Sequence, residues 1–290
     1  MTPGTQSRIE TALSARVVAV KSIAGGDIND AYRIELSDGR FAFVKSNLVA
    51  PKGMFPAEAK GLRWLREPNV IRVPEIYAVC RDDATGQAAF LVLEWLEPGQ
   101  KVAKFDECLG QGLAALHLSG APGFGFDSSN FIGSLPQDNQ PENNWCDFYF
   151  RRRLEPQVRR AQNSQKLGAS TVLNFDKLYE KLSKLFDTPE PPARLHGDLW
   201  GGNLHTDSSG MPCVIDPAVY GGHREMDLAM MRLFGGFSSH VFAAYAERYP
   251  LAPGFEDRVP LMQLYPLLVH VNLFGGGYAE SVRKTLARYV

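Results

Sequence analysis

The stretch RLHGDLWGGNLHTDSSGMPCVIDPA, residues 194–218, decides the fold. In it, His196, Asp198 and Asn203 follow the spacing His-x-Asp-x-x-x-x-Asn, and a short apolar run leads into Asp216. Any one of these aspartates is typical of a turn or a helix cap. The complete set has the spacing of a kinase catalytic loop followed by an aspartate that binds metal. It predicts Asp198 as the base for an acceptor hydroxyl, and Asn203 and Asp216 as oxygen ligands of Mg²⁺.

This interpretation requires a nucleotide-binding apparatus upstream, and the sequence offers one. Lys45 lies near the end of a predicted strand, on the same face as Phe41 and Phe43. Glu58 lies at the start of the next predicted helix. A lysine on the third strand and an acid on the following helix are the pair that holds ATP phosphates in kinases. The predicted nucleotide site also includes a phosphate loop and a hinge whose backbone faces the adenine, formed by Gly25, Gly26, Asp27, Glu94, Trp95 and Leu96.

The hydrophobic pattern of the chain changes at Glu97-Pro98-Gly99. Before it, alternating apolar residues predict strands over 15–23, 30–36, 40–46, 76–83 and 88–96, with a hairpin turn at Ser37-Asp38-Gly39 and a helix over 55–67. After it, helical periodicity dominates. We therefore expect an α+β, two-lobed fold, with a β-rich nucleotide-binding lobe over residues 1–96 and a mainly helical catalytic and substrate-binding lobe over residues 97–290.

Composition narrows the function further. The 290 residues carry a formal net charge of -1, so nucleic acid and anionic membranes are not expected as partners. The N-terminus has no signal-peptide core and no apolar run is long enough to span a membrane, which favours a cytoplasmic protein. The four cysteines form no CxxC pair and no histidines stand at ligand spacing, so free thiols are expected and zinc is not.

Several residues near the loop have two interpretations. Trp200 either stacks on a substrate sugar or packs beneath the loop. Trp145 and Tyr149 lie on one helical face with Phe148 and Arg152, a stripe typical of a core, and are also candidates for the substrate side of the site. His196 is expected to brace the loop through hydrogen bonds rather than to transfer protons. Asp227 is expected to accept hydrogen bonds from the loop backbone or to cap its own helix rather than to touch substrate.

Taken together, these motifs resemble the fructosamine kinase (ketosamine-3-kinase) family, relatives of the aminoglycoside and choline kinases with a protein-kinase-like fold. The resemblance is carried by LHGDLWGGN at 195–203, VIDPAVYGGHREMDLAMMRLFGGF at 214–237, GGDINDAYRI at 25–34 and YPLLVHVNLFGGGY at 265–278. It implies phosphorylation, by ATP and Mg²⁺, of a sugar hydroxyl of a ketosamine such as fructosamine or ribulosamine. In members acting on fructosamines the 3-hydroxyl is the acceptor, and the product then decomposes and frees the amine (deglycation).

The sequence also departs from protein kinases. HGD replaces HRD, DPA replaces DFG, and no APE segment follows, so no activation-loop switch is expected. Two alternatives stay open: a kinase of the same fold that acts on an aminoglycoside, choline or another hydroxyl, and a nucleotide-binding scaffold without catalysis. The sequence leaves the preferred sugar, the choice between a free and a protein-bound amine, and the oligomeric state undetermined.

Overall fold

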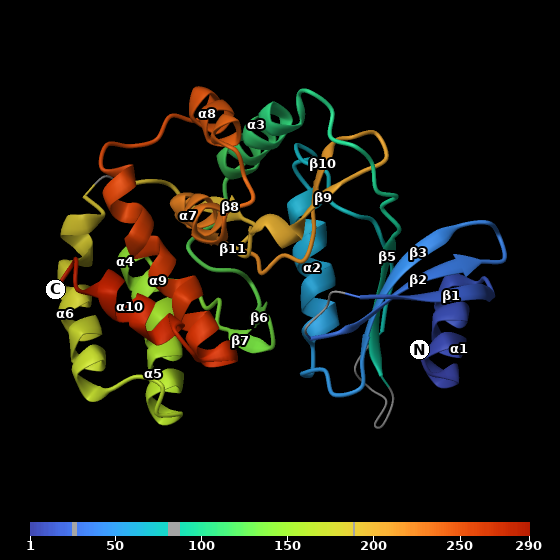
Figure 1. The fold of residues 1–290 in the computed structure, drawn as a ribbon, viewed down its shortest axis with the longest axis horizontal. Helices are drawn as coiled ribbons and strands as arrows, with labels where there is room; N and C mark the ends of the chain where they lie inside the picture. The colour runs from blue at the N-terminus through green and yellow to red at the C-terminus, as the bar shows by residue number, and fades with distance from the viewer. Residues whose placement is uncertain (25–27, 81–87, 188) are drawn as a thin grey trace. The chain divides into compact units, whose positions relative to one another are not determined.

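The computed structural model describes residues 1–24, 28–80, 88–187 and 189–290 (Figure 1). It divides into two compact units. Unit 1 contains Met1–Phe105 and Leu204–Pro217, and unit 2 contains Asp106–Asn203 and Ala218–Val290. The segment that carries Asp216 is therefore part of unit 1, although in the sequence it is preceded and followed by residues of unit 2. The functional division at residues 96 and 97 stays a prediction.

Unit 1 is built on an antiparallel sheet with the strand order β1-β2-β3-β5-β4. Its strands are β1 (Val17–Ile23), β2 (Asp30–Leu36), β3 (Phe41–Asn47), β4 (Ile76–Val79) and β5 (Ala89–Glu94). These elements confirm the predicted strands within the described residues. The hairpin between β2 and β3 turns at Gly39, whose φ of 86° lies in the left-handed region that glycine adopts without strain.

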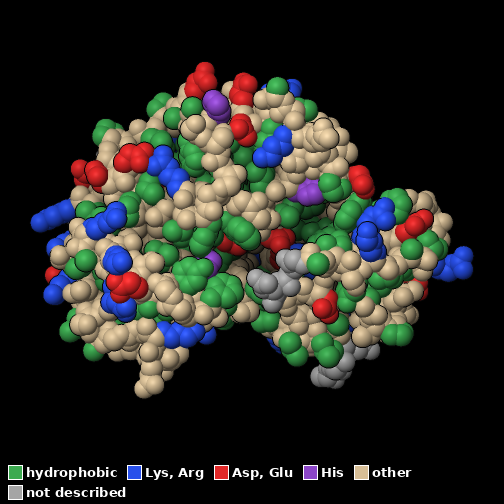
Figure 2. Space-filling view, viewed as in Figure 1, with side chains coloured by type: hydrophobic (Ala, Val, Ile, Leu, Met, Phe, Trp, Pro, Cys, Tyr) green, Lys and Arg blue, Asp and Glu red, His purple; other side chains and the backbone are tan. Residues whose placement is uncertain are grey.

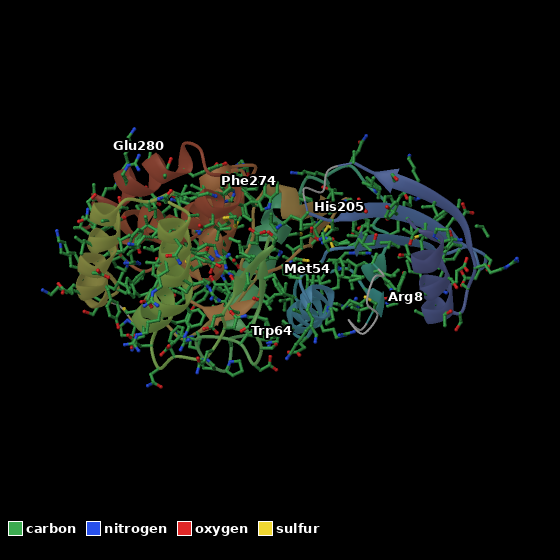
Figure 3. The ribbon with its side chains drawn as sticks, turned by 90° about the horizontal axis from the view of Figure 1, so that it is seen from below. Arg8, Met54, Trp64, His205, Phe274 and Glu280 are labelled. Atoms are coloured by element: carbon green, nitrogen blue, oxygen red, sulfur yellow. The ribbon has the colours of Figure 1, made fainter. Side chains whose placement is uncertain are left out.

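Two helices lie on opposite sides of this sheet (Figure 1). Helix α1 (Pro3–Leu13), which the sequence analysis missed, begins at Thr2, whose side chain accepts a hydrogen bond from the backbone of Thr5. Its buried Ile9 joins Ala42 and Val44 of β3 in one hydrophobic cluster. Helix α2 (Met54–Arg66) confirms the prediction over 55–67, and its buried Met54 and Trp64 are labelled in Figure 3. Alternation along β3 turns Lys45 away from the α1 face.

A short hairpin completes unit 1. It consists of β9 (Leu204–Thr206) and β10 (Pro212–Val214), which pair antiparallel. Gly99 donates a backbone hydrogen bond to Thr206, and Val214 donates one to Arg72. The Arg72 guanidinium also lies 3.1 Å from Asp207. These contacts fasten the segment that leads into Asp216 to the N-terminal part of the chain.

Unit 2 is mainly helical. Its helices are α3 (Phe105–Leu118), α4 (Trp145–Phe148), a π-helical turn (Tyr149–Leu154), α5 (Glu155–Asn163), α6 (Ala169–Leu185), the 3₁₀ turn Gly201–Asn203, α7 (Glu225–Phe234), α8 (Ser239–Arg248), α9 (Phe255–Phe274) and α10 (Tyr278–Leu286). Helix α3 begins at the last residue of unit 1. Short strand pairs, β6 (Asn130–Ile132) with β7 (Leu135–Gln137) and β8 (Ala193–Leu195) with β11 (Tyr220–Gly222), flank the loop that carries Asp198. The two units together confirm the mixed α+β architecture.

The last features of the fold are the distribution of surface charge, the character of the helices and the state of the cysteines. On the face shown in Figure 2, basic and acidic side chains are interspersed. Among the described residues, no helix combines the length and the apolar character needed to cross a membrane. The four cysteines all lie in described segments, and no disulfide joins them.

Candidate active site

In unit 1 the three charged residues singled out from the sequence meet. The Lys45 ammonium donates to Glu58 Oε1 at 2.8 Å and to Asp216 Oδ1 at 2.5 Å. Burial by itself would lower the pKa of Lys45, but the carboxylates of Asp216 and Glu58 outweigh it and raise that pKa. Lys45 is therefore a permanent cation held between two acids, in reach of the residue predicted to bind metal.

Asp216 has an unusual backbone. Its φ of 57° lies in the left-handed region, where residues other than glycine are uncommon. The strand β10 runs directly toward it, and its side chain is 40% exposed. The chain thus stores some backbone strain at the position where a metal ligand is predicted.

The predicted hinge follows β5. The Glu94 carboxylate accepts hydrogen bonds from the Arg72 guanidinium at 2.6 Å and from the Glu75 backbone at 3.2 Å. The Trp95 indole donates to Glu97, and Leu96 is buried. The side chains of Glu94 and Trp95 are thus engaged with the protein, which leaves the role predicted for this segment to its backbone. The predicted phosphate-loop residues Gly25, Gly26 and Asp27 lie outside the described residues.

In unit 2 the loop around Asp198 is held by backbone contacts. Gly197 has a φ of 83°, and a Cβ atom there would overlap the carbonyl oxygen of Ala218. The Ala218 backbone in turn donates to the His196 carbonyl at 2.9 Å. Glycine at this position therefore does more than remove the arginine of HRD, because no side chain fits between the two segments.

Asp227 of α7 holds the same loop through hydrogen bonds to its backbone. Its buried carboxylate accepts hydrogen bonds from the backbone of His196 at 2.8 Å and of Gly197 at 2.9 Å. His117 Nε2 lies 3.2 Å from it, and His117 Nδ1 lies 2.8 Å from the Tyr245 hydroxyl. Burial would raise the pKa of Asp227, but the hydrogen bonds from His117 and the loop lower it. The expected contact with the loop backbone is confirmed.

His196 also performs its expected bracing role. It is buried, and its Nδ1 accepts a hydrogen bond from the Asp198 backbone at 3.3 Å. The Asn203 side chain donates to the Asp198 carbonyl at 2.7 Å and to Asp198 Oδ2 at 3.1 Å. These bonds hold the Asn203 side chain against Asp198. An amide oxygen on Asn203 and a carboxylate on Asp216 are the hard donors that Mg²⁺ prefers.

A second group of possible metal ligands is better explained by ion pairs. Ligand atoms of Glu190, His223 and Glu225 lie within 4.8 Å of one another. Arg224 contacts both oxygens of Glu190 at 2.7 Å, and Arg258 contacts both oxygens of Glu225 at 2.6 and 2.8 Å. Each carboxylate is thus compensated by an arginine.

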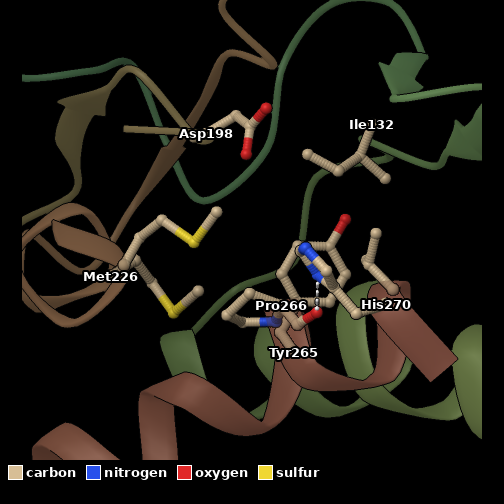
Figure 4. Close-up of a pocket in the computed structure, with 9 residues that line it drawn as sticks. Ile132, Asp198, Met226, Tyr265, Pro266 and His270 are labelled. Atoms are coloured by element: carbon tan, nitrogen blue, oxygen red, sulfur yellow. Dashed lines mark hydrogen bonds between the residues drawn. The ribbon is translucent and has the colours of Figure 1, made fainter. Parts of the chain in front are cut away.

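Asp198 lines a pocket of unit 2 (Figure 4). Most of the lining is apolar, and it comprises Ile132, Gly197, Asp198, Met226, Met230, Tyr265, Pro266, Val269 and His270. Figure 4 shows the carboxylate of Asp198, the side chain of Met226 and the imidazole of His270 around one space. Asp198 is the sole carboxylate among these lining residues.

His270 is a wall residue with a defined tautomer. Its Nδ1 lies 2.8 Å from the Pro266 carbonyl, the bond dashed in Figure 4. A carbonyl can only accept, so Nδ1 carries the proton and Nε2 is left as an acceptor. Burial lowers the pKa of His270, which keeps the ring neutral near pH 7. The position of His270 in the sequence predicts no role for it in the site.

Trp200 is exposed to 43% and its ring lies over Gly202, where a Cβ atom would overlap it. The glycine pair 201–202 thus makes room for the indole beside the catalytic loop. Trp145 and Tyr149 lie elsewhere. Both are buried and stack on each other at 5.2 Å, and the Tyr149 hydroxyl donates to the Leu261 carbonyl. Neither contributes to the lining of the Asp198 pocket, and their contacts are those of core residues.

Comparison with known proteins places the chain in a family. A sequence profile described as fructosamine kinase matches residues 2–290. The chain belongs to the fructosamine kinase family. It is 38% identical to a candidate ketoamine kinase of Enterococcus faecium, with 96% of each chain covered. It is 37% identical to the ketosamine-3-kinase of Mus musculus, with 91% of this chain and 93% of the mouse protein covered.

Solved structures of fructosamine kinase relatives share the fold. The crystal structure of a candidate fructosamine-3-kinase from Thermobifida fusca superposes with a TM-score of 0.89 at 39% identity, covering 99% of this chain and 98% of that one. A more distant structure, the amicoumacin kinase hAmiN in complex with AMP-PNP, Ca²⁺ and Ami, gives a TM-score of 0.63 at 15% identity, covering 99% of this chain and 93% of that one. The second likeness concerns the fold alone. These matches confirm the resemblance read from the sequence, the kinase-like fold and the class of activity to which the relatives belong.

Proposed function

We propose that this fructosamine kinase family member transfers the γ-phosphoryl group of ATP to a sugar hydroxyl of a ketosamine, the 3-hydroxyl, and so promotes deglycation. The observation that carries the proposal is the pocket in which Asp198 is the one carboxylate among apolar side chains. A second support is the Lys45, Glu58 and Asp216 trio in unit 1. The names of the relatives supply the acceptor class.

The roles of the residues follow from their contacts. Asp198 accepts the proton of the acceptor hydroxyl as that oxygen attacks the γ-phosphorus, and the bond to the leaving ADP oxygen breaks. Asp227, through the backbone of His196 and Gly197, keeps the loop that carries Asp198 in place. Lys45 offsets charge on the ATP phosphates, and Glu58 orients its ammonium.

The donor set at Asn203 and Asp216 fits Mg²⁺, as their oxygens are hard ligands. When bound, the ion would offset negative charge on the transferring phosphoryl group. The adenine would be bound by the backbone of Glu94, Trp95 and Leu96, and the phosphates by the loop with Gly25, Gly26 and Asp27. Trp200, exposed next to the loop, is a candidate for stacking on the sugar.

The test has two stages. Stabilisation by ATP with Mg²⁺ in a thermal-shift assay, compared with ATP and EDTA, examines the nucleotide and metal assignments. ATP consumption is then measured with fructosamine, ribulosamine, an aminoglycoside and choline as acceptors, and ³¹P-coupled NMR locates the new phosphate ester. We expect turnover with the ketosamines and a 3-phosphate product. Turnover with the aminoglycoside or choline alone, or stabilisation without turnover on any acceptor, would overturn the proposal.

A further inference from the structure

A cluster of aromatic side chains lies at the wall of the Asp198 pocket, outside the groups used above. The ring of His270 is 4.6 Å from that of Phe234, 5.3 Å from that of Phe274 and 5.0 Å from that of Tyr278. The cluster thus joins the ends of α7 and α9 with the start of α10. Because His270 also lines the pocket, the cluster is continuous with the site that contains the base.

The cluster is open to solvent on one side. Phe234 is 38% exposed and Phe274 is 58% exposed, and Figure 3 shows Phe274 at the surface of unit 2. Each of these phenylalanines is the last residue of its helix and is followed by a glycine with positive φ, Gly235 or Gly275. A Cβ atom on either glycine would meet nothing within 4 Å, so the chain is also open to solvent directly after each phenylalanine. Two large exposed aromatic residues beside an active-site pocket are typical of a binding surface.

The charges around the rings are also informative. Elsewhere in the molecule, Arg33 lies 3.9 Å from the centre of the Phe41 ring and Lys101 lies 4.5 Å from that of Phe105. In the described segments, no Arg or Lys side chain is found over Phe234, Phe274 or Tyr278. His270 adds no charge, since burial lowers its pKa. The cluster therefore offers neutral aromatic faces that can attract a cation from solution.

A ketosamine supplies such a cation next to its reacting hydroxyl. Its amine is basic, and its protonated form is an ammonium cation. Four single bonds of about 1.5 Å each separate the amine nitrogen from the 3-hydroxyl oxygen, so the two groups are at most about 5 Å apart. With the hydroxyl at Asp198, the amine and its substituent extend from the pocket along its wall.

From this arrangement we infer that Phe234, Phe274 and Tyr278 form the subsite for the amine part of the substrate. The aromatic faces bind the ammonium group, and the exposed side of Phe274 packs against the substituent of the amine. The inference rests on the proposed function and adds a substrate class to it: ketosamines whose amine carries an apolar or aromatic substituent. Polycationic acceptors are disfavoured, because Asp198 is the one carboxylate in the pocket lining.

The experiment compares two acceptors that differ only at the amine, 1-amino-1-deoxyfructose and its N-benzyl derivative. We expect the wild-type protein to show a lower KM for the N-benzyl compound. Phe274→Ala and Phe234→Ala should each raise that KM about 5- to 10-fold, the size of an aromatic or cation-π contact, and change the KM of the unsubstituted acceptor by less than about 3-fold. Phe274→Tyr keeps an aromatic ring, so the ratio of its two KM values should equal the wild-type ratio, in contrast to that of Phe274→Ala.

Controls separate this inference from the proposed function. Leu173→Ala on α6 removes another exposed apolar side chain, 61% exposed, and should leave both KM values unchanged. The KM for ATP and the thermal midpoint should stay at wild-type values in every variant. Equal KM changes for both acceptors, or none, would overturn the aromatic subsite while ketosamine turnover continues. Absence of turnover on every ketosamine by the wild-type protein would instead overturn the proposed function.

Discussion

Units 1 and 2 hold their reactive side chains by different physical means. In unit 1, Lys45 is positioned by two opposite charges, those of Glu58 and Asp216. In unit 2, the loop that carries Asp198 is held by backbone hydrogen bonds to Asp227 and by the fit of Gly197 against Ala218. Ion pairs can exchange partners when phosphates arrive, whereas a loop fixed by its backbone cannot. Under the proposed function, this difference predicts an adaptable nucleotide half, unit 1, and a preorganised acceptor half, unit 2.

The largest effect is expected on kcat when Asp198, the proposed base in unit 2, is replaced. Asp198→Ala removes the proton acceptor, so kcat should fall about 10²- to 10⁴-fold. Nucleotide affinity, measured by calorimetry with ATP, should remain within about 3-fold, because a base for the acceptor hydroxyl makes little ground-state contact with ATP. A variant that keeps more than a tenth of wild-type kcat would contradict the assignment of Asp198 as base.

The adaptable half should respond in a graded manner. Lys45→Met removes the cation proposed to face the ATP phosphates, and kcat should fall about 10²- to 10³-fold. Glu58→Gln keeps Lys45 bonded to Asp216 and loses one charged hydrogen bond, so kcat/KM for ATP should fall about 10-fold. Steady-state kinetics with varied ATP measures both. Equal losses in the two variants would show that Glu58 does more than orient Lys45.

The fit of the catalytic loop is tested by two glycines with nearly equal φ. Gly197→Ala combines an unfavourable φ with an overlap on the Ala218 carbonyl, and we expect it to lower the free energy of unfolding by about 3 kcal/mol. Gly39→Ala has the same φ problem in open space and should cost about 1 kcal/mol. Equilibrium unfolding in urea measures the free energy of unfolding of both variants. Similar costs for both would mean that the loop moves away from Ala218 at little expense.

The last predicted effect is a dependence of stability on pH, which leaves catalysis itself unchanged. His223 is packed against the Glu190–Arg224 and Glu225–Arg258 pairs, and burial lowers its pKa to about 4 from an ordinary 6.5. Between these values the unfolded chain binds the proton and the folded chain does not, so stability falls as the pH drops from 6.5 to 4. The expected loss is about 2 kcal/mol. His223→Gln should flatten the curve in this range; an unchanged slope would assign the dependence to other groups.

Motif order was sufficient to predict the charged part of the site. Lys45, Glu58 and Asp216 are far apart in sequence, yet each belongs to a short pattern with its own chemistry, and the structure joins them by hydrogen bonds. The strands of unit 1 were predictable for a related reason, since alternation is local. Helix α1 was missed because its signals, Thr2 as cap and Pro3 at the first turn, are weak without a strong apolar stripe.

The acceptor side could not be predicted in the same way. Met226, Met230, Tyr265 and Val269 lie in helical stretches whose periodicity describes burial, and periodicity does not distinguish a pocket wall from a core. The same ambiguity applies to Trp145 and Tyr149, which are buried in a stacked pair. His270 carried one available signal, its place in YPLLVHVNLFGGGY, but its neighbours Phe234 and Tyr278 come from other helices.

The placement of the β9–β10 hairpin has a consequence for synthesis of the chain. Unit 1 contains Leu204–Pro217, so its fold and its Asp216 carboxylate cannot be complete when residue 105 leaves the ribosome. The sheet and α2 can form early, but Lys45 must wait for one of its two partners until about a hundred further residues have been made. A nascent or truncated N-terminal half is therefore expected to hold a buried lysine with a single counter-charge. The competence to bind nucleotide then arises late, together with the loop that carries the base.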